Sequence, residues 1–132
     1  MLRRRRTQPE SNRSGDAATS ALSTPVSVVD DNNFFERTTG AVTVVDFWAP
    51  WCGPCRSFAP IFESAATDHS AVRFGKCNVD VSPKAAGLLQ IQSIPTLVVF
   101  GPDGSELGRV SGVLPRRQLD ALIEELAPTA SA

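Results

Sequence analysis

The 132-residue sequence is poor in cysteine, has little net charge and contains no long apolar run. Three cysteines are too few, and odd in number, for a secreted scaffold held by disulfides, so we expect a mostly reduced intracellular protein. The formal net charge of −1 gives no electrostatic basis for binding nucleic acid. Because no apolar run approaches the roughly 20 residues of a membrane-spanning helix, we expect no membrane span.

Residues 1–24 differ in composition from the rest of the chain. Four consecutive arginines at positions 3–6 are followed by polar and small residues, with almost no large apolar side chain. We expect a disordered Arg/Ser-rich extension, because such a segment buries too little apolar surface to offset the entropy lost on ordering. It lacks the apolar centre of a secretory signal, and Glu10 and Asp16 interrupt any organellar transit peptide. The arginines could contact nucleic acid or an acidic membrane surface, or the segment could be a solvated tail or follow a start codon placed too early.

An ordered domain is predicted over residues 25–127, followed by a frayed tail at residues 128–132. Strands are predicted where β-branched and apolar residues cluster, at residues 26–29, 42–49, 72–79, 96–100 and 106–111. Helices are predicted at residues 33–38, 56–67, 84–89 and from Pro115 onward. In detail, we expect inward-facing Phe34 and Phe35, a kink at Pro60, an N-cap at Ser82, and one apolar stripe of Leu119, Leu122, Ile123 and Leu126. Strands and helices in this order predict an α/β fold, with a central mixed β-sheet of about five strands flanked by about four helices.

The segment Trp51-Cys52-Gly53-Pro54-Cys55 carries the chemistry of this chain. Two cysteines separated by two residues can close a small disulfide ring or supply half of a metal site. Here they lie where a buried strand passes into an amphipathic helix, and the free N–H groups and dipole of that helix favour a negative charge on Cys52. Since the thiolate is the reactive form of cysteine, this position favours redox chemistry. A zinc site would need His69 and Cys77, whose spacing matches no common zinc pattern.

Three segments together resemble the thioredoxin family. They are residues 45–55 (Val-Asp-Phe-Trp-Ala-Pro-Trp-Cys-Gly-Pro-Cys), 76–80 (Lys-Cys-Asn-Val-Asp) and 94–97 (Ile-Pro-Thr-Leu). A lone pair of spaced cysteines is a weak signal, but this combination is specific, and the similarity extends from about Val26 to Ala127. The resemblance implies a thioredoxin fold and a protein-disulfide reductase. In it, Cys52 would be the exposed attacking thiolate and Cys55 the more buried resolving thiol.

Asp46 stands inside an apolar strand, six residues before Cys52. An unpaired carboxylate there is costly, so burial is expected to raise the pKa of Asp46. A carboxyl group tuned toward neutrality could exchange a proton with Cys55, and the resemblance places Lys76 beside this acid. The alternative is an edge-strand aspartate that faces water.

The resemblance also assigns a substrate surface around Cys52. Pro95 matches the family's cis-proline, which would leave the Thr96 backbone free to pair with an extended segment of the substrate; the alternative is an ordinary trans proline that opens a strand. Trp48 is expected to pack beneath the active-site turn, and Cys77 to be a buried, inert thiol. The remaining members of the expected apolar surface are Trp51, Gly53, Pro54, Ile94, Gly112 and Val113.

By resemblance, Gly53 and Pro54 favour an enzyme that reduces protein disulfides. We expect it to be a cytoplasmic monomer that is recharged by an NADPH-dependent thioredoxin reductase. No metal or cofactor is expected, because the dithiol itself carries two electrons. Two alternatives remain open at this point. One is an exported disulfide oxidase or isomerase, and the other is a docking subunit that uses the surface around Cys52 while its redox activity is incidental.

Overall fold

The computed structural model describes residues 25–127 of the chain, so the extension expected at residues 1–24 and the tail at residues 128–132 lie outside the described residues. Within this range, no helix is long and apolar enough to cross a bilayer.

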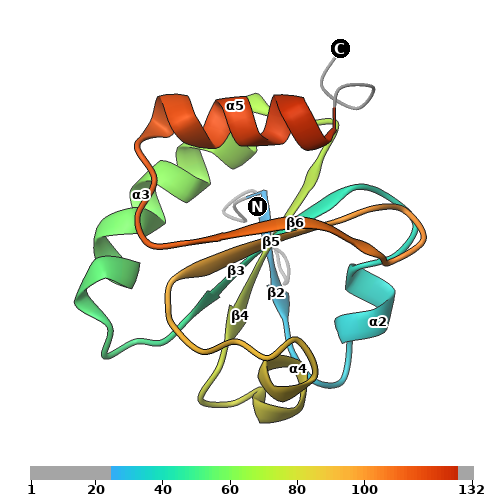
Figure 1. Ribbon diagram of the computed structural model, residues 1–132, viewed down its shortest axis with the longest axis vertical. Coiled ribbons are helices and arrows are strands. Elements are labelled where there is room, and N and C mark those ends of the chain that lie inside the picture. Colours follow the sequence, from blue (N-terminus) through green and yellow to red (C-terminus); the bar gives the residue numbers. More distant parts are fainter. Residues whose placement is uncertain (1–24, 128–132) are drawn as a thin grey trace, which may run out of the picture.

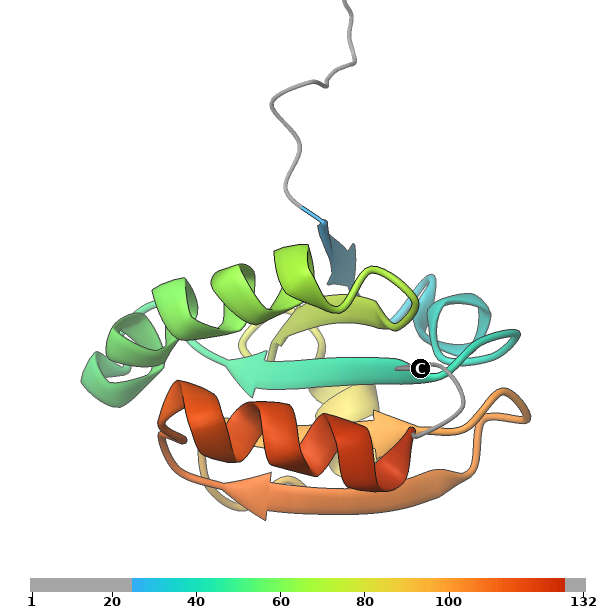
Figure 2. The same ribbon diagram turned by 90° about the horizontal axis from the view of Figure 1, so that it is seen from above.

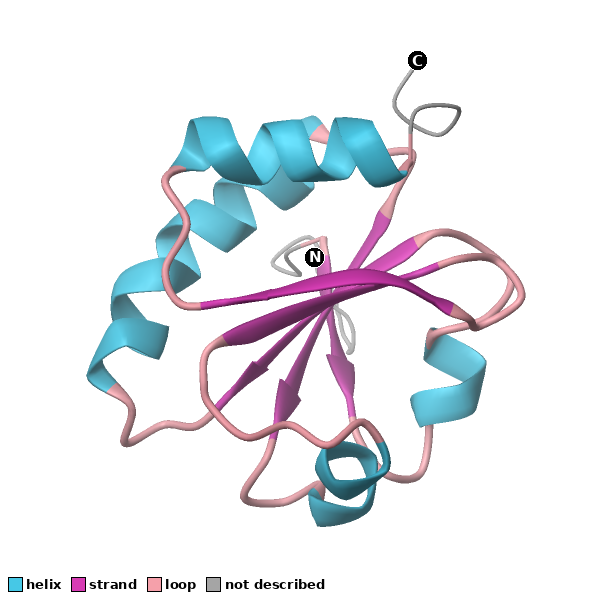
Figure 3. Ribbon diagram, in the orientation of Figure 1, coloured by secondary structure: helices cyan, strands magenta, loops and turns pink. Residues whose placement is uncertain are grey.

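Within residues 25–127, five strands form one mixed sheet in the order β2-β4-β3-β5-β6 (Figures 1 and 3). Neighbouring strands β2, β4 and β3 are parallel, whereas β5 is antiparallel to β3 and β6 is antiparallel to β5. The strands are β2 Val26–Val29, β3 Thr43–Trp48, β4 Arg73–Asn78, β5 Thr96–Phe100 and β6 Glu106–Ser111. The mixed sheet expected from the alternating pattern is confirmed, each strand lying within two residues of its predicted bounds.

In the part of the chain that the structure describes, four helices cover the two faces of this sheet: α2 Phe34–Arg37, α3 Gly53–Asp68, α4 Pro83–Leu88 and α5 Arg116–Leu126. Figures 1 and 2 show α3 and α5 together on one side of the sheet. They bury a core there that includes Phe58, Phe62, Leu119 and Ile123. A smaller core on the opposite face contains Val45, Phe47, Cys77 and Ala85, with Phe34 packed against it. The expected apolar stripe of α5 is confirmed, because Leu119 and Ile123 are buried and Leu122 and Leu126 pack against the same core.

Strand β3 lies at the centre of the sheet because its sequence is apolar on both faces. Residues 43–47 are all buried, although one of them is the acid Asp46. Consecutive side chains of a strand point to opposite faces, so Val44, Asp46 and Trp48 share the face that α3 covers. The structure thereby contradicts the alternative of an edge-strand aspartate facing water.

Two local predictions were wrong. Phe35 is 79% exposed, and only Phe34 packs inward, with its ring edge-on to Phe100. Helix α3 begins at Gly53, three residues before the predicted start, and ends at Asp68. Pro60 lies inside the helix as expected, and the kink there stays a prediction. Ser82 is the N-cap residue of α4 and Pro83 begins the helix, as predicted, but the Ser82 side chain makes no capping hydrogen bond. The carboxylate of Asp31 accepts hydrogen bonds from the backbone N–H groups of Lys84 and Ala85 instead, at 3.2 and 2.8 Å.

Candidate active site

Cys52 and Cys55 form a disulfide at the start of α3, with their Cα atoms 5.2 Å apart. Strand β3 ends at Trp48, and a tight turn follows in which the Cys52 N–H donates to the carbonyl of Ala49 at 3.1 Å. The helix begins at the next residue, and Pro54 fits its first turn because the N–H that proline lacks would have no partner there. Strand, turn and helix thus place both sulfurs at one helix entrance, as the sequence predicted.

Cys52 is the N-cap of α3, and its Sγ accepts a hydrogen bond from the backbone N–H of Cys55 at 3.2 Å. An N-cap side chain satisfies one of the free N–H groups in the first helical turn. In the reduced protein the same N–H and the helix dipole would stabilise negative charge on this sulfur. The geometry therefore favours Cys52 as the more acidic sulfur of the pair.

The two sulfurs are less accessible than the sequence suggested. Cys52 is 5% exposed and Cys55 1% exposed, so the expected exposed attacking residue is in fact buried in the disulfide form. They pack with Ala49 in a small cluster bordered by Trp48, Val79 and Ile94. These contacts cover both sulfurs and account for their burial. The remaining accessible surface lies mostly on Cys52, so the expected order of burial is observed.

An apolar surface surrounds the disulfide. Trp51 is 68% exposed and its Nε1–H donates to the Asp80 carboxylate at 3.0 Å, which fixes the indole beside the cysteines. The Ile94–Pro95 peptide bond is cis, as expected from the resemblance, and the carbonyl oxygen of Ile94 lies 3.9 Å from Cys52 Sγ. The N–H of Gly112 donates to the carbonyl of Pro95 at 2.8 Å, so the loop after β6 is held against this segment.

Accessibility divides the residues expected to form this surface. The accessible or partly accessible ones are Trp51, Gly53, Pro54, Ile94, Gly112 and Val113. Pro95 and Thr96 are buried. The structure does not leave the Thr96 backbone available to a substrate, because Thr96 lies in register between Phe47 of β3 and Ser111 of β6. Ile94, which precedes the cis bond, is partly exposed, and its carbonyl oxygen is the one that lies 3.9 Å from Cys52 Sγ.

Sequence reasoning missed a pocket of about 200 Å³ beside Trp51. This pocket extends the apolar surface toward α4. The only sequence signal that could have indicated it was Ile94, the residue before the cis-proline. Its lining residues are Trp51, Val79, Ala86, Ile91, Gln92, Ser93 and Ile94.

Asp46 is fully buried, and neither carboxylate oxygen has a hydrogen-bond partner. Burial raises the pKa of Asp46 from 3.8 to about 7, and the positive charge of Lys76 opposes that shift. The expected direction of the shift is therefore confirmed, and desolvation is its main cause. A carboxyl group with this pKa can both accept and release a proton near neutral pH.

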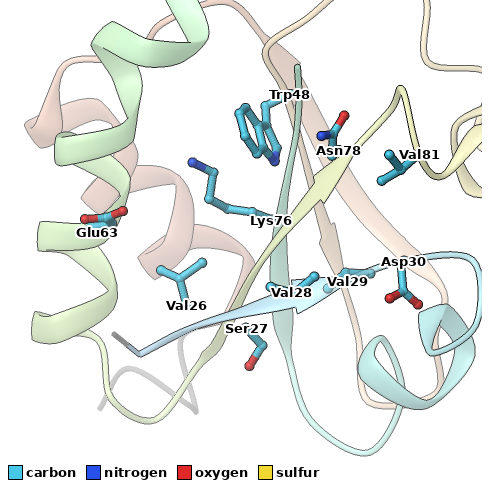
Figure 4. Close-up of a pocket in the computed structure, with 10 residues that line it drawn as sticks. All are labelled: Val26, Ser27, Val28, Val29, Asp30, Trp48, Glu63, Lys76, Asn78 and Val81. Atoms are coloured by element: carbon cyan, nitrogen blue, oxygen red, sulfur yellow. The ribbon is translucent and has the colours of Figure 1, made fainter. Parts of the chain in front are cut away.

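Lys76 lies directly beside Asp46 in the register of β4 and β3. Its ammonium nevertheless stands over the indole of Trp48, with Nζ 4.3 Å from the ring centroid. Figure 4 shows these two side chains together in a pocket of about 330 Å³, across from Glu63 of α3. Trp48 is thus more than the packing residue that the sequence suggested.

The remaining candidate ligands lie elsewhere. Cys77 belongs to the core on the opposite face, where burial raises the pKa of its thiol to about 11. His69 follows the end of α3, and its Nε2 pairs with the carboxylate of Asp120 in α5 at 2.8 Å. Between residues 25 and 127, no group of three or more His, Cys, Asp or Glu side chains is placed to hold a metal ion. His69 and Cys77, the two further ligands that a zinc site would need, therefore do not lie beside the Cys52–Cys55 pair.

Comparison with known proteins gives a consistent result. A sequence model of the family described as "Thioredoxin" matches residues 25–125. The thioredoxin of Staphylococcus saprophyticus is 41% identical over 98 residues, which are 74% of this chain and 93% of that protein. The thioredoxin of Chlamydia pneumoniae is 39% identical over 102 residues, 77% of this chain and 99% of that protein. The crystal structure of Malassezia sympodialis thioredoxin superposes with a TM-score of 0.70 at 34% identity, covering 81% of this chain and 91% of that one.

Proposed function

Since this chain belongs to the thioredoxin family and is a thiol–disulfide oxidoreductase, we propose that Cys52 is its attacking sulfur and Cys55 its resolving sulfur. The observation that carries this assignment is the hydrogen bond from the Cys55 N–H to Cys52 Sγ at the N-cap of α3. It gives Cys52, and not Cys55, a donor that stabilises the thiolate.

The reaction conserves electrons without any cofactor. In the reduced protein, the Cys52 thiolate attacks one sulfur of a substrate disulfide, forms a mixed disulfide and expels the other substrate sulfur as a thiolate. Cys55 then loses its proton and attacks Cys52 Sγ, which releases the second substrate thiolate. Two electrons have passed from the dithiol to the substrate, and the Cys52–Cys55 disulfide of the present structure remains. Thioredoxin reductase, the recharging partner typical of this family, returns two electrons from NADPH.

We propose that Asp46 accepts the proton that the Cys55 thiol loses when it attacks the mixed disulfide. The resolving thiol must be deprotonated in a buried site, and Asp46 is a buried acid on the sheet face that α3 covers. Its pKa of about 7 leaves it partly ionised at neutral pH, so it can accept this proton. Asp46→Asn is expected to slow resolution of the mixed disulfide and to remove the corresponding step from the pH–rate profile. An unchanged profile would contradict this role.

The substrate is proposed to bind across Trp51, Ile94 and Val113, with its backbone beside the Ile94 carbonyl rather than beside Thr96. That carbonyl lies 3.9 Å from Cys52 Sγ, which suits a substrate strand whose cysteine reaches the same sulfur. The pocket beside Trp51 would accept an apolar side chain of the substrate. Because the surface offers mostly apolar area and backbone groups, it suits many unfolded or extended protein segments.

We further propose that this protein works in the cytoplasm as a monomer. Recharging requires NADPH, and Cys77 is a free thiol, both of which suit a reducing compartment. Both reactive sulfurs and Asp46 come from one chain, so the site is complete without a second copy.

The direct test is reduction of insulin disulfides with thioredoxin reductase and NADPH. The parent chain is expected to turn over, and Cys52→Ser, Cys55→Ser and the double variant are expected to be inactive as catalysts. A docking subunit would keep its binding partners in the double variant, and an oxidase or isomerase would show a more oxidising potential of the Cys52–Cys55 pair. Failure of the parent chain to reduce insulin would favour the docking function.

A further inference from the structure

The arrangement of Asp46 and Lys76 is unexpected for two opposite charges on adjacent strands. They occupy paired positions of β3 and β4 and point to the same face, so a direct ion pair would need no movement of the backbone. Yet neither oxygen of Asp46 accepts a hydrogen bond, and Lys76 Nζ lies over Trp48 instead. Trp48 is two residues beyond Asp46 on the same strand and face, within reach of the same ammonium group.

The other neighbours of Asp46 do not explain why Lys76 stays away from it. On the opposite side, β5 presents apolar Leu97 in register with Asp46. Helix α3 presents Cys55 at the active site and Glu63 at the pocket rim. Among the described residues, Lys76 has no ion pair with Glu63 closer than 4.0 Å. Figure 4 shows the Lys76 side chain beside the Trp48 indole, and Nζ lies 4.3 Å from the ring centroid. The ring face of Trp48 is thus the group that holds the ammonium, an attraction expected of a cation over an aromatic ring within about 6 Å.

We propose that Trp48 is a positioning residue whose indole face holds the Lys76 ammonium off the Asp46 carboxylate, leaving both carboxylate oxygens without a partner. The inference rests on the proposed proton-transfer role of Asp46. Its consequence is that Lys76 acts on Asp46 only as a nearby charge and not as an ion-pair partner. An ion pair would favour the ionised, hydrogen-bonded carboxylate and so make it less able to accept the proton of Cys55.

The experiment measures the titration of Asp46 itself, by carboxyl ¹³C NMR of the oxidised protein, in which Cys52 and Cys55 do not titrate. The variants are Trp48→Leu, Trp48→Phe, Lys76→Met and the double variant Trp48→Leu with Lys76→Met. Trp48→Leu is expected to lower the midpoint by about one pH unit or more, because an opposite charge within about 4–6 Å lowers a carboxyl pKa by about 1–3 units. Trp48→Phe keeps a ring face and is expected to stay close to the parent.

The double variant separates positioning from simple burial. If Trp48 acts through Lys76, then Trp48→Leu shifts the midpoint little once Lys76 has been replaced by methionine. An equal shift in both backgrounds would show that Trp48 only excludes water from Asp46, and no shift in the presence of Lys76 would show that it does not restrain the ammonium. Either result overturns the proposal.

A measurement on the parent chain keeps the proposal testable if Trp48→Leu does not fold. The ε-methylene protons of Lys76 lie near the indole, so their NMR signals should be shifted upfield by the ring current. This shift should persist as the pH rises through the titration of Asp46. Its loss on ionisation of Asp46 would mean that Lys76 leaves Trp48 for the carboxylate, contrary to the proposal. These readouts do not involve turnover. If Asp46 does not transfer protons, only the reaction rates of Asp46→Asn would show it. That failure is therefore distinguishable from failure of the positioning role of Trp48.

Discussion

Cys52 Sγ accepts a hydrogen bond from the backbone N–H of Cys55, 3.2 Å away, although the two residues are also joined through their sulfurs. The residue proposed to resolve the mixed disulfide thus also provides an N–H to the sulfur proposed to attack. Because this donor belongs to the backbone of the first turn of α3, it remains in place when the disulfide is reduced.

Alkylation of the reduced protein should therefore be selective. In a Cys55→Ser variant, Cys52 is expected to react with iodoacetamide with a midpoint clearly below pH ~8.5, the pKa of a free cysteine thiol. Cys77 is an internal control, because it is fully buried and burial raises its pKa to about 11. Mass spectrometry of peptides from samples alkylated at several pH values measures both sites. A Cys52 midpoint at or above pH ~8.5 would refute stabilisation of the thiolate by the helix.

Asp46 should make stability fall as pH rises. Its pKa is about 7 in the folded protein and near 3.8 when unfolded, so between these values the folded state holds a proton that the unfolded state has lost. The contribution is fully present below pH ~4 and is lost as pH rises through about 7. At about 1.4 kcal/mol per pKa unit, the loss amounts to roughly 4 kcal/mol.

Asp46→Asn lacks this titration. Relative to the parent, its free energy of unfolding is expected to increase by about 2–4 kcal/mol between pH 4 and pH 8. Urea denaturation of the oxidised proteins at the two pH values measures the difference. A constant difference between parent and variant would show that Asp46 is not a buried acid of raised pKa.

Gly75 allows β2 and β4 to approach closely. A Cβ atom there would lie 2.5 Å from Val29 Cγ2, whereas a Cβ atom on Gly87 in α4 would meet nothing within 4 Å. Gly75→Ala is expected to destabilise the protein by about 1–3 kcal/mol through overpacking. Gly87→Ala, the matched control, should stabilise it by about 0.5–1 kcal/mol because alanine favours a helix. Chemical denaturation of both variants provides the comparison, and similar values for the two would contradict it.

Asp31, and not Ser82, is expected to stabilise the start of α4. Asp31→Ala should cost about 1 kcal/mol, because two backbone N–H groups lose their acceptor. Ser82→Ala should affect the start of α4 much less, because the Ser82 side chain makes no capping hydrogen bond. The free energies of unfolding of these two variants provide the comparison. A larger loss of stability in Ser82→Ala than in Asp31→Ala would contradict the prediction.

Features set by neighbouring residues could be predicted from the sequence. The β-branched runs around Val44 and Val98 indicated the central strands, and the leucine and isoleucine spacing after Pro115 indicated α5. The position of Cys52 between an apolar strand and a helix indicated that its sulfur lies at a helix entrance. In each of these cases the deciding interactions lie within one segment of the chain.

Features that depend on residues far apart in the sequence could not be predicted. The cap of α4 comes from Asp31, more than 50 residues earlier, and His69 finds its partner 51 residues later in Asp120. Helix α2 has only four residues, too few for a periodic pattern to decide whether Phe35 faces inward. Burial of Cys52 and the contact of Lys76 with Trp48 likewise depend on how the strands and α3 pack together.

Trapping of the mixed disulfide tests most directly which sulfur attacks and which resolves. The Cys55→Ser and Cys52→Ser variants, each reduced, are to be mixed with a disulfide-containing protein and analysed by non-reducing electrophoresis and mass spectrometry. We expect Cys55→Ser to accumulate a stable adduct joined through Cys52, and Cys52→Ser to form almost none. Adducts joined through Cys55 in the Cys52→Ser variant, at a comparable rate, would contradict the assignment.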